Sequence, residues 1–242
     1  MGKIYVVGLG PGDENNMTFH ADEAVKSSDI VIGYKVYIDL IKDIYPDKEY
    51  IESGMRQEID RCEKCIKLAE EGKTVSLVCS GDAGIYGMAS PLLETAEKHG
   101  FSDVEIVPGI TAASAGAAIL GAPLSHDFCV ISLSDLLTPW EVIENRLICA
   151  AKGDFCIVLY NPSSKKRQDY LKKACNIMST HIAPDTACGY VRNIARDGME
   201  KKLCTFKELS EEQIDMFVTV FIGNSQTKIE NNRLITPRGY KG

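Results

Sequence analysis

The stretch VSLVCSGDAGIYG, residues 75–87, runs from a strand-forming apolar segment straight into a glycine-rich turn. A turn that binds phosphate offers free backbone N–H groups, usually with a lysine or a helix N-terminus beside them. This turn carries the acidic residue Asp82 and no basic residue. It therefore predicts a buried strand that ends at the site of a ligand that is not mainly phosphate.

Two further turns have the same design. The first strand-like run leads into GLGPGD, residues 8–13, which imitates the dinucleotide-binding fingerprint. Asp13 stands at the third glycine position, and Pro11 has no N–H and a fixed φ, so a nicotinamide or flavin site is disfavoured. The third turn, PGIT at residues 108–111, opens a helix of very small residues, which allows a backbone or a ligand to come close.

Strand-like and helical patterns alternate along the chain. This alternation predicts an α/β fold with mostly parallel and mixed sheets. The expected strands are residues 4–7, 30–32, 75–79, 104–107, 129–133, 155–160, 186–191, 202–205 and 216–222, and the expected helices are residues 21–27, 36–44, 58–71, 90–99, 112–118, 139–150 and 166–178. The break at LGAPL, residues 120–124, predicts two domains, 1–122 and 123–242, with the second completing a cleft.

Bulk properties exclude several classes of protein. The formal charge of -7 over 242 residues disfavours a general nucleic-acid binder. No apolar run approaches the roughly 20 residues that span a bilayer, and no signal-peptide pattern is present, so a cytoplasmic location is expected. The nine cysteines lie mostly in apolar segments, as reduced core thiols do. Cys62 and Cys65 form a C-x-x-C pair without a second pair, and the four histidines are scattered, so no metal site is predicted.

The three turns combine backbone, hydroxyl groups and carboxylates. The side chains concerned are Ser80, Thr111, Ser114, Asp13 and Asp82, with Asn161 at a turn of the second domain. Such a set suits a hydroxylated, partly apolar ligand with a positive centre, and S-adenosylmethionine has these properties. Taken singly, the aspartates and Thr111 could equally be helix caps and Ser114 a packing residue.

The motifs LGPGD (9–13), SGDAGIYG (80–87) and VPGITA (107–112) resemble those of the tetrapyrrole methylase family, in the same order and spacing. Further stretches resemble the branch of that family that methylates carbon 17 of precorrin-3B: GYKVY (33–37), SHDF (125–128), SLSDLLTPW (132–140), LYNP (159–162) and TPRGY (236–240). Ala83 stands where the family often has proline.

The resemblance implies a two-domain class III methyltransferase fold, a homodimer, and S-adenosylmethionine held in the cleft between the domains. It implies methylation of carbon 17 of precorrin-3B or its cobalt-bearing counterpart, with ring contraction, in cobalamin biosynthesis. By the same resemblance, the cofactor contacts are Pro11, Ser80, Gly81, Asp82, Ile85, Thr111, Ala112, Asn161, Ile194 and Thr219.

Ring contraction moves protons, and His126 with Asp127 is the candidate acid–base pair, unless both are ordinary linker residues. The substrate carries many carboxylates, so a local basic lining is expected, with Lys35, Arg192 and Arg196 as the main candidates. Arg56, Lys165, Lys166 and Arg167 are weaker ones, because the charge run at 165–167 is also typical of a solvated helix start.

Four alternatives remain open at this level. The chain could be a sister methylase acting at another ring carbon, a member of the family that modifies a protein or RNA, a nucleotide-binding dehydrogenase, or a binding module without catalysis. The sequence leaves open whether the substrate carries cobalt, which surface forms the dimer, and whether Cys62 and Cys65 have a role.

Overall fold

The structure is a computed structural model that describes residues 2–164 and 167–240. The chain divides into two compact units, unit 1 with residues 1–112 and unit 2 with residues 113–242. The division expected from the sequence, after residue 122, differs by the segment that holds most of α5 (Ala112–Leu120). This helix joins unit 2 because Gly116 packs so tightly that an added Cβ would lie 2.7 Å from Phe221 Cζ.

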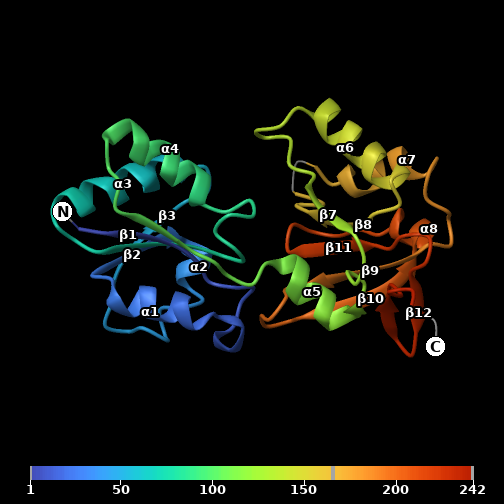
Figure 1. Cartoon of the computed structure of the whole chain (residues 1–242), viewed down its shortest axis with the longest axis horizontal. Helices are drawn as coiled ribbons and strands as arrows, with labels where there is room; N and C mark the ends of the chain where they lie inside the picture. Colours follow the sequence, from blue (N-terminus) through green and yellow to red (C-terminus); the bar gives the residue numbers. More distant parts are fainter. Residues whose placement is uncertain (1, 165–166, 241–242) are drawn as a thin grey trace. The chain divides into compact units, whose positions relative to one another are not determined.

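Unit 1 is built on a five-stranded sheet whose strands all run parallel. Their order is β3 (Glu49–Ser53), β2 (Ile30–Tyr34), β4 (Val75–Cys79), β1 (Ile4–Gly8) and β5 (Val104–Val107). Helices α3 (Glu58–Glu70) and α4 (Ala89–His99) cover one face, and α1 (Phe19–Ser27) and α2 (Lys35–Ile38) cover the other (Figure 1). The short 3-10 helix η1 (Glu14–Asn16) follows the first glycine turn.

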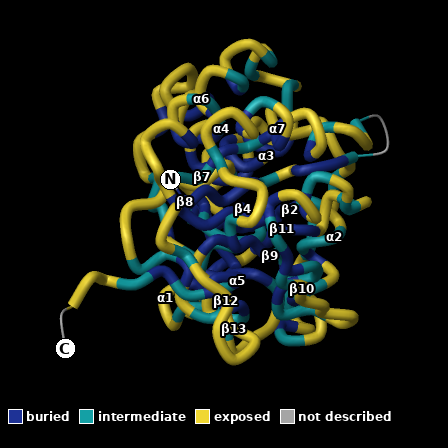
Figure 2. Tube along the Cα trace, turned by 90° about the vertical axis from the view of Figure 1, so that its right-hand side faces the viewer, coloured by how far each residue is buried: buried dark blue, intermediate teal, exposed yellow. Residues whose placement is uncertain are grey.

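Each face of this sheet has its own apolar core. Ile4, Leu77 and Leu92 belong to the core under α3 and α4, whereas Val7, Val25 and Ile41 belong to the core under α1 and α2. A parallel sheet that is covered on both sides needs strands that are apolar at nearly every position, and β4 is buried throughout. The strands form the buried interior in Figure 2, and the exposed parts of the tube are loops and outer helix sides.

Unit 2 has a mixed sheet in the order β10 (Glu200–Thr205), β9 (Ala187–Arg192), β11 (Val218–Ile222), β8 (Cys156–Tyr160) and β7 (Phe128–Ser132). Only β7 and β8 are parallel to each other in this sheet; the other neighbours are antiparallel. A small sheet joins β12 (Lys228–Glu230), β13 (Arg233–Ile235) and β6 (Gly121–Ala122). Helices α6 (Trp140–Lys152) and α7 (Tyr170–Met178) pack on one face of the large sheet, and α8 (Phe206–Leu209) follows β10.

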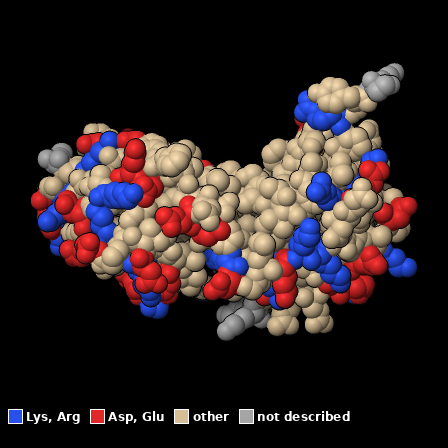
Figure 3. Space-filling model, turned by 90° about the horizontal axis from the view of Figure 1, so that it is seen from below, with Lys and Arg blue, Asp and Glu red and all other residues tan. Residues whose placement is uncertain are grey.

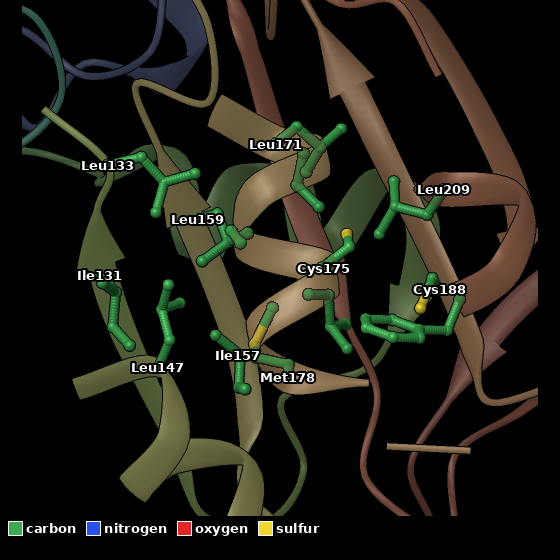
Figure 4. Packing of buried hydrophobic residues seen from close by; sticks show 14 of the residues in the cluster. Ile131, Leu133, Leu147, Ile157, Leu159, Leu171, Cys175, Met178, Cys188 and Leu209 are labelled. Atoms are coloured by element: carbon green, nitrogen blue, oxygen red, sulfur yellow. The ribbon is translucent and has the colours of Figure 1, made fainter. Parts of the chain in front are cut away.

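The core of unit 2 lies between α6, α7 and the large sheet. Leu147, Leu171 and Met178 from the helices meet Ile157 and Leu159 from β8 (Figure 4). The two units therefore confirm the predicted α/β fold with a parallel and a mixed sheet.

Several local expectations need correction; the short elements β6, β12, β13 and α8, for example, were not predicted. The helix expected over residues 36–44 ends at Ile38 and continues as turns, in which Ile41 N donates to Ile38 O and Ile44 N to Ile41 O. The helix expected from residue 166 begins at Tyr170. Strand β3 was not predicted, because its sequence EYIES is half polar, as suits an edge strand.

Candidate functional site

The three glycine turns of unit 1 meet at the carboxyl edge of the parallel sheet. They follow β1, β4 and β5, which are neighbours in the order β4-β1-β5. Gly10 N donates to Gly81 O at 3.1 Å, and Gly81 N donates to Gly10 O at 2.8 Å. A Cβ on Gly109 would lie 2.1 Å from Gly81 O and 2.4 Å from Gly8 O. The turns thus touch through their backbones, and a side chain at Gly109 has no room.

Asp82 fastens these turns to one another. Its Oδ1 accepts from Gly84 N at 2.8 Å, and its Oδ2 accepts from Gly109 N at 3.0 Å. Both carboxylate oxygens are therefore engaged with backbone N–H groups. The sequence suggested that Asp82 would face a positive ligand, whereas its hydrogen bonds give it a positioning role between the second and third turns.

Asp13 has the capping role that was weighed as its alternative. Its Oδ1 accepts from Asn16 N at 3.0 Å, at the start of η1. Three glycine N–H groups of the turns are also engaged: those of Gly10 and Gly81 with each other's carbonyls, and that of Gly109 with Asp82. This arrangement explains why the turns do not present a phosphate cradle.

Unusual backbone conformations occur at the candidate cofactor positions of both units. Tyr86 beside Ile85 has φ 55°, Asn161 has φ 52°, and Asn193 and Ala195 on either side of Ile194 have φ 49° and 54°. Non-glycine residues seldom adopt positive φ, at a cost on the order of 1–3 kcal/mol each, and such residues concentrate at ligand-binding sites. These angles therefore favour a binding role for the turns that contain them.

The candidates of unit 2 lie at one edge of its large sheet. The register pairs Leu159 of β8 with Val220 of β11, so the end of β8 at Asn161 lies by the start of β11 near Thr219. Val191 of β9 pairs with Thr219, so Ile194 follows β9 at this edge too. Asn161 Nδ2 donates to Ser132 Oγ at 2.9 Å, which joins the end of β8 to the end of β7. We call this the Asn161 edge.

His126 and Asp127 lie at the other edge of the same sheet. They precede β7, whereas the Asn161 edge lies beyond its last residue, Ser132. Five residues of strand span roughly 16 Å. His126 Nδ1 is 3.7 Å from Asp127 Oδ2, and both side chains are exposed. The structure does not bring this pair together with the other unit 2 candidates.

Arg192 ends β9 at the Asn161 edge and faces two carboxylates. Its Nε is 3.5 Å from Asp215 Oδ2, and its Nη1 is 3.8 Å from Glu200 Oε2. Among the described residues, Nε is buried and has no hydrogen-bond partner. A buried donor of this kind has unused capacity for a ligand carboxylate.

The other basic candidates differ in their surroundings. Lys35 Nζ pairs with Glu52 Oε2 at 3.0 Å, and Arg167 Nε pairs with Asp135 Oδ1 at 2.5 Å. Arg196 follows Arg192 in the strained turn, and Arg56 is exposed in unit 1. Lys165 and Lys166 lie outside the described residues. On the face shown in Figure 3, acidic and basic side chains are interspersed, without a broad basic area.

The nine cysteines are free thiols, and seven of them are buried. Burial raises the pKa of Cys62 and Cys79 to about 11. In residues 2–164 and 167–240, no group of three or more His, Cys, Asp or Glu side chains is placed to hold a metal ion. The described helices include none that is both long and apolar enough to cross a membrane.

The sequence indicated no role for individual residues of SLSDLLTPW, residues 132–140, beyond the family resemblance. In the structure, Ser132 Oγ accepts from Asn161 Nδ2, and Asp135 Oδ2 accepts from Tyr170 Oη at 2.6 Å. No local pattern could have revealed Tyr170, because it comes from a helix 35 residues further along the chain.

A family model, named relatives and solved structures all place this chain among the same group of proteins. The family model described as Tetrapyrrole (Corrin/Porphyrin) Methylases matches residues 3–210. A protein of Salmonella typhimurium, named probable cobalt-factor III C(17)-methyltransferase, is 46% identical over 238 residues, which are 98% of this chain and 99% of that protein.

Two solved structures show the same fold. The crystal structure of the methyltransferase CobJ has a TM-score of 0.92 and 35% identity, and the match covers 98% of this chain and 100% of that one. A uroporphyrin-III C-methyl transferase from Thermus thermophilus, complexed with S-adenyl homocysteine, has a TM-score of 0.72 and 19% identity, covering 92% and 97% of the two chains.

Proposed function

Because the chain belongs to the tetrapyrrole (corrin/porphyrin) methylases, we propose that it methylates carbon 17 of cobalt-factor III or of metal-free precorrin-3B, with ring contraction, in cobalamin biosynthesis. The observation that carries this proposal is the 46% identity to a relative of that name, across nearly the whole length of both chains. The cobalt-bearing substrate comes first because that relative is named for it. Membership of the family leaves no support for the dehydrogenase alternative.

The proposed methyl donor is S-adenosylmethionine, and S-adenosylhomocysteine is the product. An electron-rich ring carbon attacks the methyl carbon, the carbon–sulfur bond breaks, and its electron pair neutralises the sulfonium. The protein needs no strong base for this step, so positioning supplies most of the rate.

The proposed cofactor contacts in unit 1 are Pro11, Ser80, Gly81, Asp82, Ile85, Thr111 and Ala112. Three observations support them: the turns meet, they leave no room for side chains between them, and Tyr86 adopts a strained conformation. Asp82 contributes through its backbone and by holding Gly109. Asn161, Ile194 and Thr219 are proposed contacts from unit 2, supported by their common edge and the strained turns.

Arg192 is the proposed receptor for a peripheral carboxylate of the substrate, with Arg196 beside it. Its buried Nε, which makes no hydrogen bond although it lies 3.5 Å from Asp215 Oδ2, supports this role. Lys35 remains a proposed contact that would have to exchange Glu52 for the substrate.

His126 and Asp127 remain the proposed proton carriers for ring contraction, and the variant His126→Ala tests them. Their place at the far edge of the sheet weakens the proposal, since no other unit 2 candidate lies near them. Full methylation and ring contraction by this variant would remove the pair from the mechanism.

The proposal includes a homodimer and a location in the cytoplasm, both of which the family resemblance supports. It also includes the domain division 1–122 and 123–242, which rests on the break at residues 120–124, whereas the two compact units divide earlier, after residue 112. Light scattering on the purified chain measures the assembly, and a mass of one chain would remove the homodimer from the proposal.

The deciding experiment incubates the protein with methyl-labelled S-adenosylmethionine and, in parallel, cobalt-factor III and precorrin-3B. Mass spectrometry then detects the added methyl group, and NMR locates it. A label on carbon 17 is expected with at least one substrate. A label on another ring carbon would identify a sister methylase, and binding of S-adenosylhomocysteine without any turnover would identify a non-catalytic module.

A further inference from the structure

Two leucines stand exposed in the loop between β7 and α6. Leu137 is 98% exposed and Leu136 is 54% exposed. Leu133, three residues before Leu136, is fully buried in the core of unit 2, next to Leu159 in Figure 4. The chain therefore leaves the core at Leu133, presents two large apolar side chains to solvent, and returns to pack at Trp140.

This loop is anchored on both sides of the leucines. Before them, Asp135 accepts from Tyr170 Oη at 2.6 Å and pairs with Arg167 Nε at 2.5 Å. After them, the ring of Trp140 packs on that of Tyr170, with centroids 4.6 Å apart. Because Tyr170 holds both ends, the exposure of the leucines is a feature of a held loop and not of a loose one.

The loop begins at the Asn161 edge. Ser132 ends β7, its Oγ accepts from Asn161 Nδ2 at 2.9 Å and from Ser134 N at 3.2 Å, and it pairs in register with Tyr160. Ligands of α/β sheets bind beyond the carboxyl ends of parallel strands, and β7 and β8 are the parallel pair of this sheet. The exposed leucines thus lie at the edge where unit 2 is proposed to contact cofactor and substrate.

We propose that Leu136 and Leu137 form an apolar platform for one face of the tetrapyrrole ring, and so help to select carbon 17. This inference rests on the proposed function. A tetrapyrrole has a broad apolar face and carboxylates at its rim, so its face needs apolar contacts while cations meet its rim. The leucines supply the first, and Arg192 at the same edge supplies the second. Asp135, Tyr170 and Trp140 fix the loop in which the two leucines are exposed to solvent. The leucines are therefore pre-organised for such a ligand.

The test compares Leu137→Ser with the wild-type chain. Trp140 is the single tryptophan, so quenching of its fluorescence by cobalt-factor III, which absorbs light, reports the dissociation constant. We expect the variant to bind cobalt-factor III about 10-fold more weakly, the effect of losing one buried leucine contact. Its affinity for S-adenosylhomocysteine, measured by calorimetry, should stay within about 2-fold, since Leu137 is not among the residues proposed to contact that ligand.

Phe19→Ser is the matched control, because Phe19 is 90% exposed and lies on α1 of unit 1. It should leave both affinities unchanged. The double variant Leu136→Ser/Leu137→Ser should also yield product methylated at other ring carbons, detected by NMR. Both leucines are exposed, so the variants should fold, and unchanged circular dichroism checks this.

An unchanged affinity of Leu137→Ser for cobalt-factor III would overturn the platform. So would a change in molecular mass by light scattering, since the leucines would then be a contact between two copies of the chain. Failure of the wild-type protein to bind S-adenosylhomocysteine or to methylate either substrate would instead overturn the proposed function.

Discussion

The candidate edges of the two units are held together by different parts of the chain. In unit 1, glycine backbones contact each other directly, and neither Gly10 nor Gly109 has room for a side chain. In unit 2, side chains join the loops: Ser132 to Asn161, and Asp135 to Tyr170 and Arg167. An edge built from backbone contacts has a single geometry, which suits a cofactor that is the same for every member of the family. A side-chain-built edge can change with sequence, which suits the choice among substrates.

The largest effect is expected from Gly109→Ala, which attacks the backbone-built edge. The new Cβ would meet Gly81 O at 2.1 Å and Gly8 O at 2.4 Å, and backbone atoms cannot move aside singly. We expect the free energy of unfolding to fall by about 3 kcal/mol or more, measured by urea denaturation, with loss of S-adenosylhomocysteine binding.

Gly54→Ala is the control for this variant. Its Cβ would lie 3.3 Å from Oε1 of Gln57, the end of a flexible side chain, so a change below about 1 kcal/mol is expected. Equal stability of the two variants would contradict the close contact of the three turns.

Asp82→Ala should have the next largest effect. It leaves Gly84 N and Gly109 N without their acceptor, which costs about 1–3 kcal/mol of stability. Asp82→Asn keeps one acceptor oxygen, so its stability should lie between that of Asp82→Ala and that of the wild type. Hydrogen exchange at the Gly109 amide should be faster in Asp82→Ala; unchanged exchange there would show that Asp82 does not fasten the turns.

Alkaline pH tests the strand that leads into the second turn. Burial raises the pKa of Cys79 to about 11, so the folded state keeps this thiol protonated. Below the unfolded pKa of about 8.5 its contribution to stability is complete. As pH rises from there towards 11, the unfolded chain loses the proton first, and stability falls by about 1.4 kcal/mol for each pH unit.

Cys79→Ala should therefore flatten the decline of the urea midpoint between pH 8.5 and 10.5. Cys149→Ala in unit 2 is the control, because Cys149 is exposed. Other buried thiols add to the slope in both variants, so the difference between the two profiles is the quantity to measure. Identical profiles would contradict the burial of the Cys79 thiol.

The sequence predicted the backbone-built edge better than the side-chain-built edge. Glycines at strand ends mark close backbone approach, and neighbouring parallel strands bring such turns together by a general rule. The partners of Asp82 could not be predicted, since a carboxylate at a turn can cap, pair or bind a ligand. Arg192 lies at a strand end, as the sequence predicted, but its neighbours Asp215 and Glu200 depend on the register of β10 and β11. His126 looked central in the chain, yet the direction of β7 places it at the far edge.

The smallest effect is expected at the side-chain-built edge, from Ser132→Ala. This variant removes the acceptor of Asn161 Nδ2 and Ser134 N, and we expect a loss of about 1 kcal/mol. Asn161→Gly removes the same bond from its other end while tolerating the positive φ. If the bond joins the ends of β7 and β8, the double variant should lose about 1 kcal/mol less than the sum of the two single losses. Additive losses in this double-mutant cycle would show that the two strand ends are independent, and the contrast between the two edges would then fail.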